Sequence, residues 1–247
     1  MIEFKPLASS SAGCCYVLSG GGAKAPLLLD CGIRYKLIQI GMNFEVSSLA
    51  GCLISHAHGD HIAAADKLIE AGVHCYASEE TWTAYDPESR SHYSNVLRLG
   101  EQSEVGDWSV IPCEAVHDAP GTFGFLVGSP QGDRILYLTD SAYAKNKFPG
   151  LTHLCIECNF DPEVIRGNAR SGKVDRSRYS RTVKTHMSID TLLGFLKAND
   201  LSKLKEIHLL HLSAANSDAV SFKRKVQEVT GVPTYIADEL SSEVIRS

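Results

Sequence analysis

The octapeptide SHAHGDHI, Ser55–Ile62, places three histidines and one aspartate close together. His56 and His58 lie two positions apart, so on an extended or tightly turned segment both rings can face one metal ion. Asp60 and His61 fall on the next turn and can face a second ion. Imidazole nitrogen and carboxylate oxygen suit zinc and its chemical neighbours. A lone histidine is more often a surface or core residue, but this pattern between a strand-like run and a helical run predicts a metal site.

Further ligands must come from elsewhere in the chain, because four side chains cannot complete two metal sites. Three candidates follow apolar, strand-like runs: His117, Asp140 and His211. Any one of them alone would be an ordinary loop residue. Together with the octapeptide they predict two divalent metal ions per chain, zinc or manganese, bridged by one carboxylate. Such a pair, about 3.5 to 4 Å apart, can bind a hydroxide nucleophile and stabilise the oxygens of an in-line displacement.

The elements that must position these residues can be predicted from apolar patterns and turn residues. Strands are expected first in hairpin-like runs, at Phe4–Leu7, Cys15–Leu18, Pro26–Asp30 and Gly51–Ser55. A helix is predicted over Ala63–Ala71, ending at Gly72. The order then repeats, with strands at Val110–Ala115, Gly124–Val127, Ile135–Leu138, Glu206–Leu212 and Thr234–Ile236, and helices after Ser188 and over Ser217–Val229. This order favours an α/β fold of two sheets packed between helices over a doubly wound parallel sheet.

Composition limits the kind of protein. Of 247 residues 44% are hydrophobic and 21% charged, and the net charge is −5, so global charge gives no sign of a nucleic-acid partner. The length predicts one domain over residues 1–247. No apolar run approaches the roughly 18 residues of a membrane span, so we expect a cytoplasmic protein without a membrane partner. The eight cysteines are expected to be reduced, with Cys155 and Cys158 buried on a strand rather than ligating zinc.

Five ordered motifs resemble those of the metallo-β-lactamase-fold hydrolases: LLLDCG with Asp30, HAHGDH, His117, YLTDSA with Asp140, and LLHLS with His211. The resemblance covers nearly the whole chain and implies a four-layer αββα sandwich with the metals at one edge between the sheets. It also implies the ligands of each ion: His56, His58 and His117 for one, and Asp60, His61 and His211 for the other. By the same resemblance Asp140 bridges the ions and Asp30 orients the site.

Other segments resemble the bacterial YycJ-type branch, relatives of the tRNA 3′-processing nucleases: LASSSAGCC, ASEETW, VHDAPGTFGF, IECNFD, THMSID and HLSAAN. The branch cleaves phosphodiester bonds of nucleic acid, so the resemblance implies a DNA exonuclease. Asn159 and Asn216 match its motifs and are candidate substrate-binding residues. Cys14, Phe160 and Thr185 depart from it, standing where the branch has Asn, His and Gly. The resemblance is compatible with a homodimer, although no apolar stripe marks an interface.

A basic segment supports a phosphate-bearing substrate. Between Arg166 and Lys184 the only acid is Asp175, and the segment holds Arg170, Lys173, Arg176, Arg178 and Arg181. Its glycines and serines predict a mobile, hydrated loop, and Tyr179 could stack on a base. Most charge runs are solvated surface, but cations concentrated in an acidic protein suit backbone phosphates.

His186 follows the basic segment and precedes Ser188, the expected N-cap of a helix. There it could hydrogen-bond a phosphate oxygen or protonate a leaving group, although a histidine that only packs would look the same. The candidate catalytic residues are therefore Asp60, Asp140 and His186. Ser9 and Ser11 lie in a polar turn that either lines the pocket or simply closes a hairpin.

Three functions compete on these residues. The favoured one is a metal-dependent phosphodiesterase that hydrolyses nucleic acid, DNA in particular. A second is a small-molecule hydrolase of the same fold, such as a cyclic nucleotide phosphodiesterase. A third is a non-enzymatic metal-binding protein, which is disfavoured because structural zinc normally has four protein ligands, whereas a bridged open pair is a catalytic arrangement.

Overall fold

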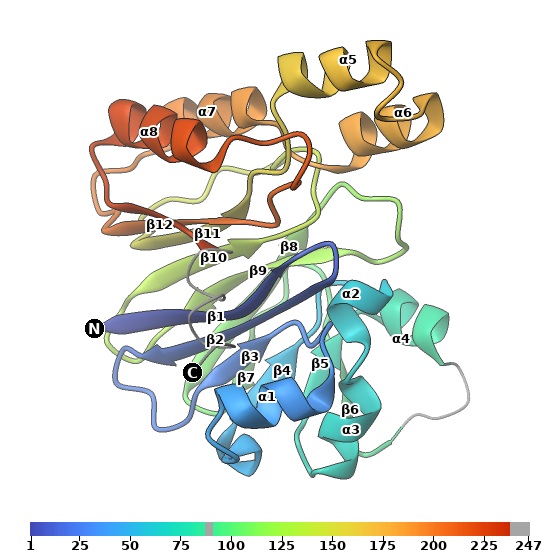
Figure 1. Ribbon diagram of the computed structural model, residues 1–247. Coiled ribbons are helices and arrows are strands. Elements are labelled where there is room, and N and C mark those ends of the chain that lie inside the picture. The colour runs from blue at the N-terminus through green and yellow to red at the C-terminus, as the bar shows by residue number, and fades with distance from the viewer. Residues whose placement is uncertain (87–90, 238–247) are drawn as a thin grey trace.

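A computed structural model describes residues 1–86 and 91–237, which form two mixed β-sheets packed face to face (Figure 1). The first sheet has the strand order β1-β2-β3-β4-β5-β6. Its strands are antiparallel from β1 to β3 and parallel from β3 to β6. Their bounds are β1 (Ile2–Ser10), β2 (Gly13–Gly20), β3 (Leu27–Leu29), β4 (Gly51–Leu53), β5 (Cys75–Ala77) and β6 (Ser94–Val96).

The second sheet has the strand order β13-β12-β11-β10-β9-β8-β7. It is parallel from β13 to β10 and antiparallel from β10 to β7. Its strands are β7 (Ser103–Val105), β8 (Trp108–Glu114), β9 (Phe123–Gly128), β10 (Arg134–Leu138), β11 (His153–Glu157), β12 (Glu206–Leu210) and β13 (Thr234–Ile236). The parallel strands bring their carboxyl ends to one edge of the sheet, where polar side chains from separate loops can meet.

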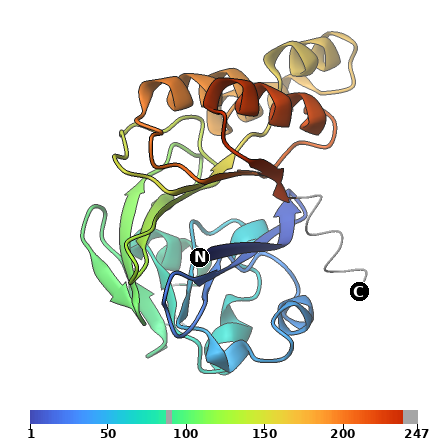
Figure 2. The same cartoon turned by 90° about the vertical axis from the view of Figure 1, so that its left-hand side faces the viewer.

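Helices cover the outer face of each sheet (Figures 1 and 2). The first sheet carries α1 (Tyr35–Gly41), α2 (Gly59–Ile62), α3 (Ala65–Glu70) and α4 (Glu79–Tyr85), and a 3₁₀ turn lies at Val46–Ser48. The second sheet carries α7 (Ile189–Ala198) and α8 (Ala219–Thr230), while α5 (Pro162–Arg170) and α6 (Arg176–Thr185) project beyond them as a helical arm. Within residues 1–86 and 91–237, no helix has the length and apolar character needed to cross a membrane.

Buried side chains form three apolar layers. One lies between the sheets, where Trp108, Tyr16 and Tyr137 are fully buried. The other two lie between each sheet and its helices. This arrangement confirms the predicted four-layer αββα sandwich.

The strands and helices predicted from sequence patterns are present, with bounds that differ by a few residues. The mobile loop predicted for the basic segment is wrong, because that segment forms the second half of α5, the turn after it and nearly all of α6. Two aspartates begin these helices: Asp161 accepts from the amides of Glu163 and Val164, and Asp175 accepts from that of Arg178. The capping hydrogen bonds therefore outweigh the low helix propensity of the glycines and serines.

Three strand ends hold non-glycine residues in the left-handed region of backbone space. Asp30 after β3 has φ 55°, Asp140 beyond β10 has φ 43°, and His211 after β12 has φ 52°. Such backbone conformations are disfavoured and concentrate at functional sites. All three are residues for which the sequence predicts a role in a metal site.

Gly32 lets two chain segments meet behind the octapeptide. A Cβ atom added there would lie 1.7 Å from the carbonyl oxygen of Asp60. The amide of Gly32 donates to the Cys14 carbonyl at 2.9 Å, and the amide of Cys31 donates to the His61 carbonyl at 2.8 Å. The octapeptide is therefore held against the Cys31–Gly32 segment after β3 at a distance that only glycine permits, and this segment is hydrogen-bonded to the start of β2.

We expect Gly32→Ala to lower the free energy of unfolding by about 1–3 kcal/mol, because backbone at Asp60 must move to admit the methyl group. Gly194→Ala is the matched control, since Gly194 lies exposed within α7 with nothing near its added Cβ. It should raise stability by up to about 1 kcal/mol. Urea denaturation measures both changes, and equal stability of Gly32→Ala and wild type would contradict the close approach.

Candidate metal centre

The octapeptide leaves the end of β4 and enters α2, which places His56 and His58 before the helix and Asp60 and His61 within it. His117 and Asp140 come from the segments that follow β8 and β10, and His211 directly follows β12. All seven predicted ligands thus lie at strand ends or in the loop and short helix α2 after β4, and the fold brings them together between the two sheets.

Three histidines form the first half of the cluster: His56, His58 and His117. The Nδ1 atom of His58 lies 3.0 Å from Nε2 of His56 and 3.2 Å from Nε2 of His117. The Oδ2 atom of Asp140 lies 3.6 Å from Nε2 of His117 and 4.0 Å from Nε2 of His56. Three imidazole nitrogens and a carboxylate oxygen that converge in this way are a donor set suited to a divalent cation.

The second half of the cluster contains Asp60, His61 and His211. The Oδ2 atom of Asp60 lies 3.7 Å from Nε2 of His61 and 3.9 Å from Nε2 of His211. Both of these Nε2 atoms are buried without a hydrogen-bond partner among the described residues. Buried polar atoms are normally satisfied, so this pair is suited to bind a cation rather than to complete a hydrogen-bond network of the protein.

Asp140 lies between the two halves. Its Oδ2 atom faces His56 and His117, while its Oδ1 atom lies 3.5 Å from His61 Nε2 and 3.3 Å from His211 Nδ1. Burial raises the pKa of this carboxyl, but the charges of His211 and His61 outweigh burial and hold the pKa well below its usual value. An ionised carboxylate with one oxygen toward each half is suited to bridge two cations.

Asp30 holds the ring of His61 from behind. This fully buried carboxylate accepts hydrogen bonds from the Ser55 amide at 2.7 Å, the Ser55 hydroxyl at 3.0 Å and the Tyr137 hydroxyl at 2.6 Å. It also lies 2.7 Å from Nδ1 of His61. With Nδ1 engaged, Nε2 is the nitrogen that faces the cluster, which is the orienting role that the resemblance implies for Asp30.

Glu157 is a site residue that the sequence reasoning missed. Its side chain is fully buried at the end of β11, and its Oε2 atom accepts from the amides of Ser141 and Met187 at 2.9 and 3.0 Å. Its Oε1 atom lies 2.6 Å from Nδ1 of His186 and 3.2 Å from Nδ1 of His211. An acidic residue directly after the apolar run Leu154–Ile156 was the signal that could have identified it.

His186 lies beside the cluster, with its Nδ1 atom 3.9 Å from Oδ2 of Asp140. Burial lowers the pKa of this imidazole, but the charge and hydrogen bond of Glu157 outweigh burial and raise the pKa above its usual value. Ser188 caps α7 as predicted, accepting from the Thr191 amide at 3.1 Å. His186 can therefore hold a proton close to the predicted metal ligands.

A cavity of about 520 Å³ opens over the cluster, and the lining includes His58, Asp60, His186, Ser11, Asn159, Arg178, Arg181 and Asn216. Five of these are predicted substrate-binding residues. The other predicted ones lie elsewhere: Ser9 is buried behind His211, where its hydroxyl accepts from the His211 amide at 3.0 Å, and Arg170, Lys173, Arg176 and Tyr179 lie on the helical arm or its turn, outside the lining.

Arg181 ties the helical arm to the cluster. Its Nε atom donates to Oδ2 of Asp118 at 2.6 Å, and Oδ1 of Asp118 lies 3.2 Å from Nε2 of His117. The ion pair is largely exposed, so it contributes at most about 1 kcal/mol to stability. Its consequence is positional, because it keeps a guanidinium at the rim of the cavity.

We expect zinc to raise the unfolding midpoint of chelator-treated protein, because a cation would satisfy the unpartnered His61 and His211 nitrogens. A ligand at a hundred times its Kd adds about 2.7 kcal/mol to the free energy of unfolding. Asp140→Asn should lose most of this gain, whereas His92→Gln, at an exposed histidine outside the cluster, should keep it. Calorimetry with and without zinc measures the unfolding midpoint of the wild type and of each variant. A wild-type midpoint that does not change with zinc would contradict the assignment.

Comparison with known proteins places the chain in a family. Residues 27–208 match the family described as beta-lactamase superfamily domain. Exodeoxyribonuclease YycJ of Bacillus anthracis is 24% identical over 92% of this chain and 89% of that protein. The metallo-beta-lactamase fold protein YhfI of Bacillus subtilis superposes with a TM-score of 0.70 at 16% identity, covering 96% of each chain. The short form of human tRNase Z superposes with a TM-score of 0.61 at 15% identity, covering 94% of this chain and 95% of that one.

The family match, the four-layer fold and the buried histidine and aspartate clusters agree with one another. They also exclude the third candidate function, that of a non-enzymatic metal-binding protein. This chain belongs to the beta-lactamase superfamily and is a metal-dependent hydrolase of the metallo-β-lactamase fold.

Proposed function

We propose that the protein is a phosphodiesterase that hydrolyses nucleic acid, and that its substrate is DNA cleaved from an end. One observation carries the proposal: Arg178 and Arg181 of α6 line the same cavity as His58, Asp60 and His186. Guanidinium groups beside a metal cluster suit a phosphate whose charge must be offset during displacement. The similarity to a protein named exodeoxyribonuclease supports the choice of DNA.

The helical arm supports a polymeric substrate rather than a single nucleotide. Arg170, Lys173 and Arg176 are exposed on the arm but lie outside the cavity. A nucleotide held over the cluster would not need them, whereas a strand leaving the cavity would pass its further phosphates along such cations. In a chain of net charge −5, this local concentration of positive charge is the feature that favours nucleic acid.

The geometry supports the division of roles that the resemblance implies. His56, His58 and His117 would hold one divalent cation, Asp60, His61 and His211 the other, and Asp140 both. When bound, the pair would supply an activated water and offset the charge on the phosphate oxygens. Arg178 and Arg181 bind the phosphate, and Asn159, which donates to the His211 carbonyl at 2.8 Å, borders it.

His186 is the proposed general acid. Its Nδ1 atom is engaged by Glu157 at 2.6 Å, which leaves Nε2 as the nitrogen available to a substrate in the cavity. In the protonated ring Nε2 carries a proton that can pass to the departing oxygen. Glu157 acts through His186 as a positioning residue, since it fixes the ring and favours its charged form.

The first test is cleavage of end-labelled single- and double-stranded DNA by metal-stripped protein resupplied with zinc or manganese. Asp140→Ala serves as the blank. We expect stepwise loss from one end in the wild type only. Inert DNA together with hydrolysis of a 3′,5′-cyclic nucleotide would instead support the small-molecule phosphodiesterase, for which the cavity of about 520 Å³ is large enough.

We expect the double substitution Arg170→Gln and Arg176→Gln to weaken DNA binding and to reduce the slope of log K against log salt by about two, if each residue contacts one phosphate. Hydrolysis of a small phosphodiester should change little, because neither residue lines the cavity. Lys197→Gln with Lys203→Gln makes the same change in net charge away from the arm and should leave the slope unchanged. Equal slopes in the two double variants would contradict a role for the arm.

We expect Glu157→Gln to move the alkaline limb of the pH dependence of kcat/KM to lower pH. Glu157 raises the pKa of His186, so the imidazolium persists to higher pH in the wild type and is lost as pH rises through that raised pKa. Without the carboxylate, burial dominates and the pKa falls. Glu206→Gln, which removes the carboxylate 3.4 Å from His208, is the control and should leave the limb in place. An unmoved limb in Glu157→Gln would exclude His186 as the acid.

A further inference from the structure

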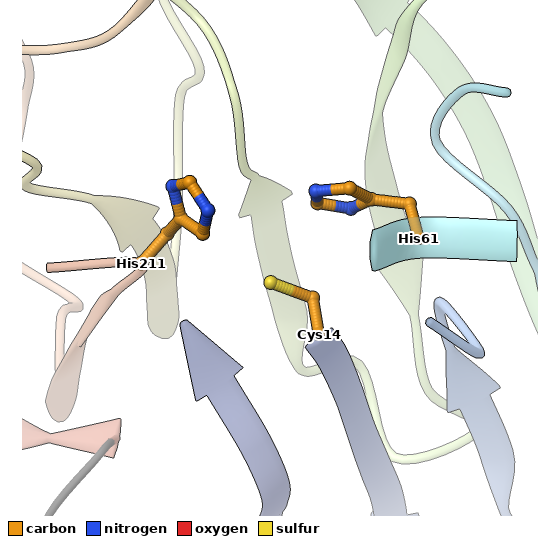
Figure 3. A group of neighbouring side chains, drawn as sticks. All are labelled: Cys14, His61 and His211. Atoms are coloured by element: carbon orange, nitrogen blue, oxygen red, sulfur yellow. The ribbon is translucent and has the colours of Figure 1, made fainter. Parts of the chain in front are cut away.

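Cys14 places a thiol in the second half of the metal cluster (Figure 3). Its sulfur and one nitrogen from each of His61 and His211 lie within 4.8 Å of one another. In Figure 3 the sulfur points from the start of β2 into the space between the two rings. Cys14 and His61 are fully buried and His211 is 3% exposed, so the thiol lies in the protein interior beside both rings.

The two histidines of this group carry the unpartnered Nε2 atoms. The Cys14 thiol makes a long contact of 3.6 Å with the carbonyl oxygen of Ser10, which it can exchange for a stronger bond. Zn–S and Zn–N bonds of about 2.3 and 2.0–2.1 Å place tetrahedral ligand atoms about 3.4–3.6 Å apart. Shifts of less than about 1 Å per side chain would therefore bring all three atoms onto one ion.

The backbone holds Cys14 in register with both histidines. The Cys14 carbonyl accepts from the Gly32 amide at 2.9 Å, and the neighbouring Cys31 amide donates to the His61 carbonyl at 2.8 Å. On the adjacent strand β1, the Ser9 hydroxyl accepts from the His211 amide at 3.0 Å. The β1–β2 hairpin is thus tied to the main chain of both histidines, to His211 through the Ser9 hydroxyl and to His61 through Cys31 and Gly32.

The next residue, Cys15, illustrates the different surroundings of a structural cysteine. Cys15 is also fully buried, but it faces the opposite side of the sheet and packs in the apolar layer beneath α1–α4. Among the eight cysteines, all within the described residues, Cys14 is the one that groups with histidines as a potential metal ligand.

We propose that Cys14 supplies a thiolate ligand to the ion held by Asp60, His61 and His211, and that this ligand makes the position selective for zinc over manganese. The inference rests on the metal centre proposed above. On binding, the S–H bond breaks, its proton leaves to solvent, and a sulfur–metal bond forms. A soft thiolate favours zinc, whereas manganese prefers oxygen ligands.

Cobalt substitution tests the ligand directly on the full-length wild-type protein. Metal-stripped protein titrated with Co²⁺ should show visible d–d bands from the bound ion and, in addition, a near-ultraviolet sulfur-to-cobalt charge-transfer band. Visible bands without the charge-transfer band would overturn the role of Cys14 and leave the metal centre intact. Absence of both bands would overturn the metal centre itself.

Two variants assign the sulfur. Cys14→Ser should lose the charge-transfer band and keep the visible bands, and Cys14→Asn provides a second replacement if the serine variant does not fold. Cys15→Ser is the matched control on the same strand and should retain both bands. A charge-transfer band that persists in folded Cys14→Ser, or disappears in Cys15→Ser, would overturn the assignment.

Metal competition tests the selectivity without reference to activity. Zinc and manganese bound at equilibrium are counted by elemental analysis over a series of concentration ratios. We expect the preference for zinc to fall by at least about tenfold in Cys14→Ser, the scale on which even outer-shell changes alter metal affinity. An unchanged preference in a folded variant would show that the sulfur does not reach the ion.

Discussion

The structure depends on a set of buried polar atoms that the protein itself leaves unsatisfied. His61 Nε2 and His211 Nε2 are buried without a hydrogen-bond partner in the described residues. Both lie close to the carboxylate of Asp60, and His61 Nε2 also lies close to that of Asp140. Buried donors and acceptors in this state are costly, and a divalent cation relieves the cost for several of them at once. The folded protein therefore needs a bound metal ion to satisfy these buried atoms.

The two sheets meet this requirement jointly. Tyr137 of the second sheet donates to Asp30 of the first, and Ser9 of the first accepts from the backbone of His211 in the second. These contacts cross the apolar layer at the edge where the ligands gather, so neither sheet positions the site alone. The left-handed backbone at Asp30, Asp140 and His211 shows the same constraint, because a strand must turn abruptly there to aim its side chain inward. Gly32 adds the close approach that packs the octapeptide against the segment after β3.

The interior site and the helical arm carry different kinds of charged group. The predicted metal ligands place carboxylates and imidazoles in the interior, while the helical arm carries guanidinium and ammonium groups at the surface. The ion pair of Arg181 with Asp118 connects the arm to these ligands. Glu157 links the sides as well, because one buried carboxylate contacts both a predicted metal ligand, His211, and the proposed acid, His186. A change at Glu157 is therefore expected to affect metal geometry and proton transfer together, which is why its pH profile is more informative than its activity alone.

The sequence by itself determined the αββα class, because strand and helix periods and the order of elements are local patterns. It also determined which histidines and aspartates gather, because their spacing and their positions after apolar runs are written in the chain. Only the tertiary structure decided the rest. Glu157 and Cys14 enter the site from strands whose sequence looks like core, and Ser9 turns away from the cavity to support His211. The basic segment is helical because Asp161 and Asp175 cap its two helices. The glycines and serines of the segment had instead suggested a loop. The physical reason is shared: whether a side chain reaches a site depends on packing between segments far apart in sequence, which no local pattern encodes.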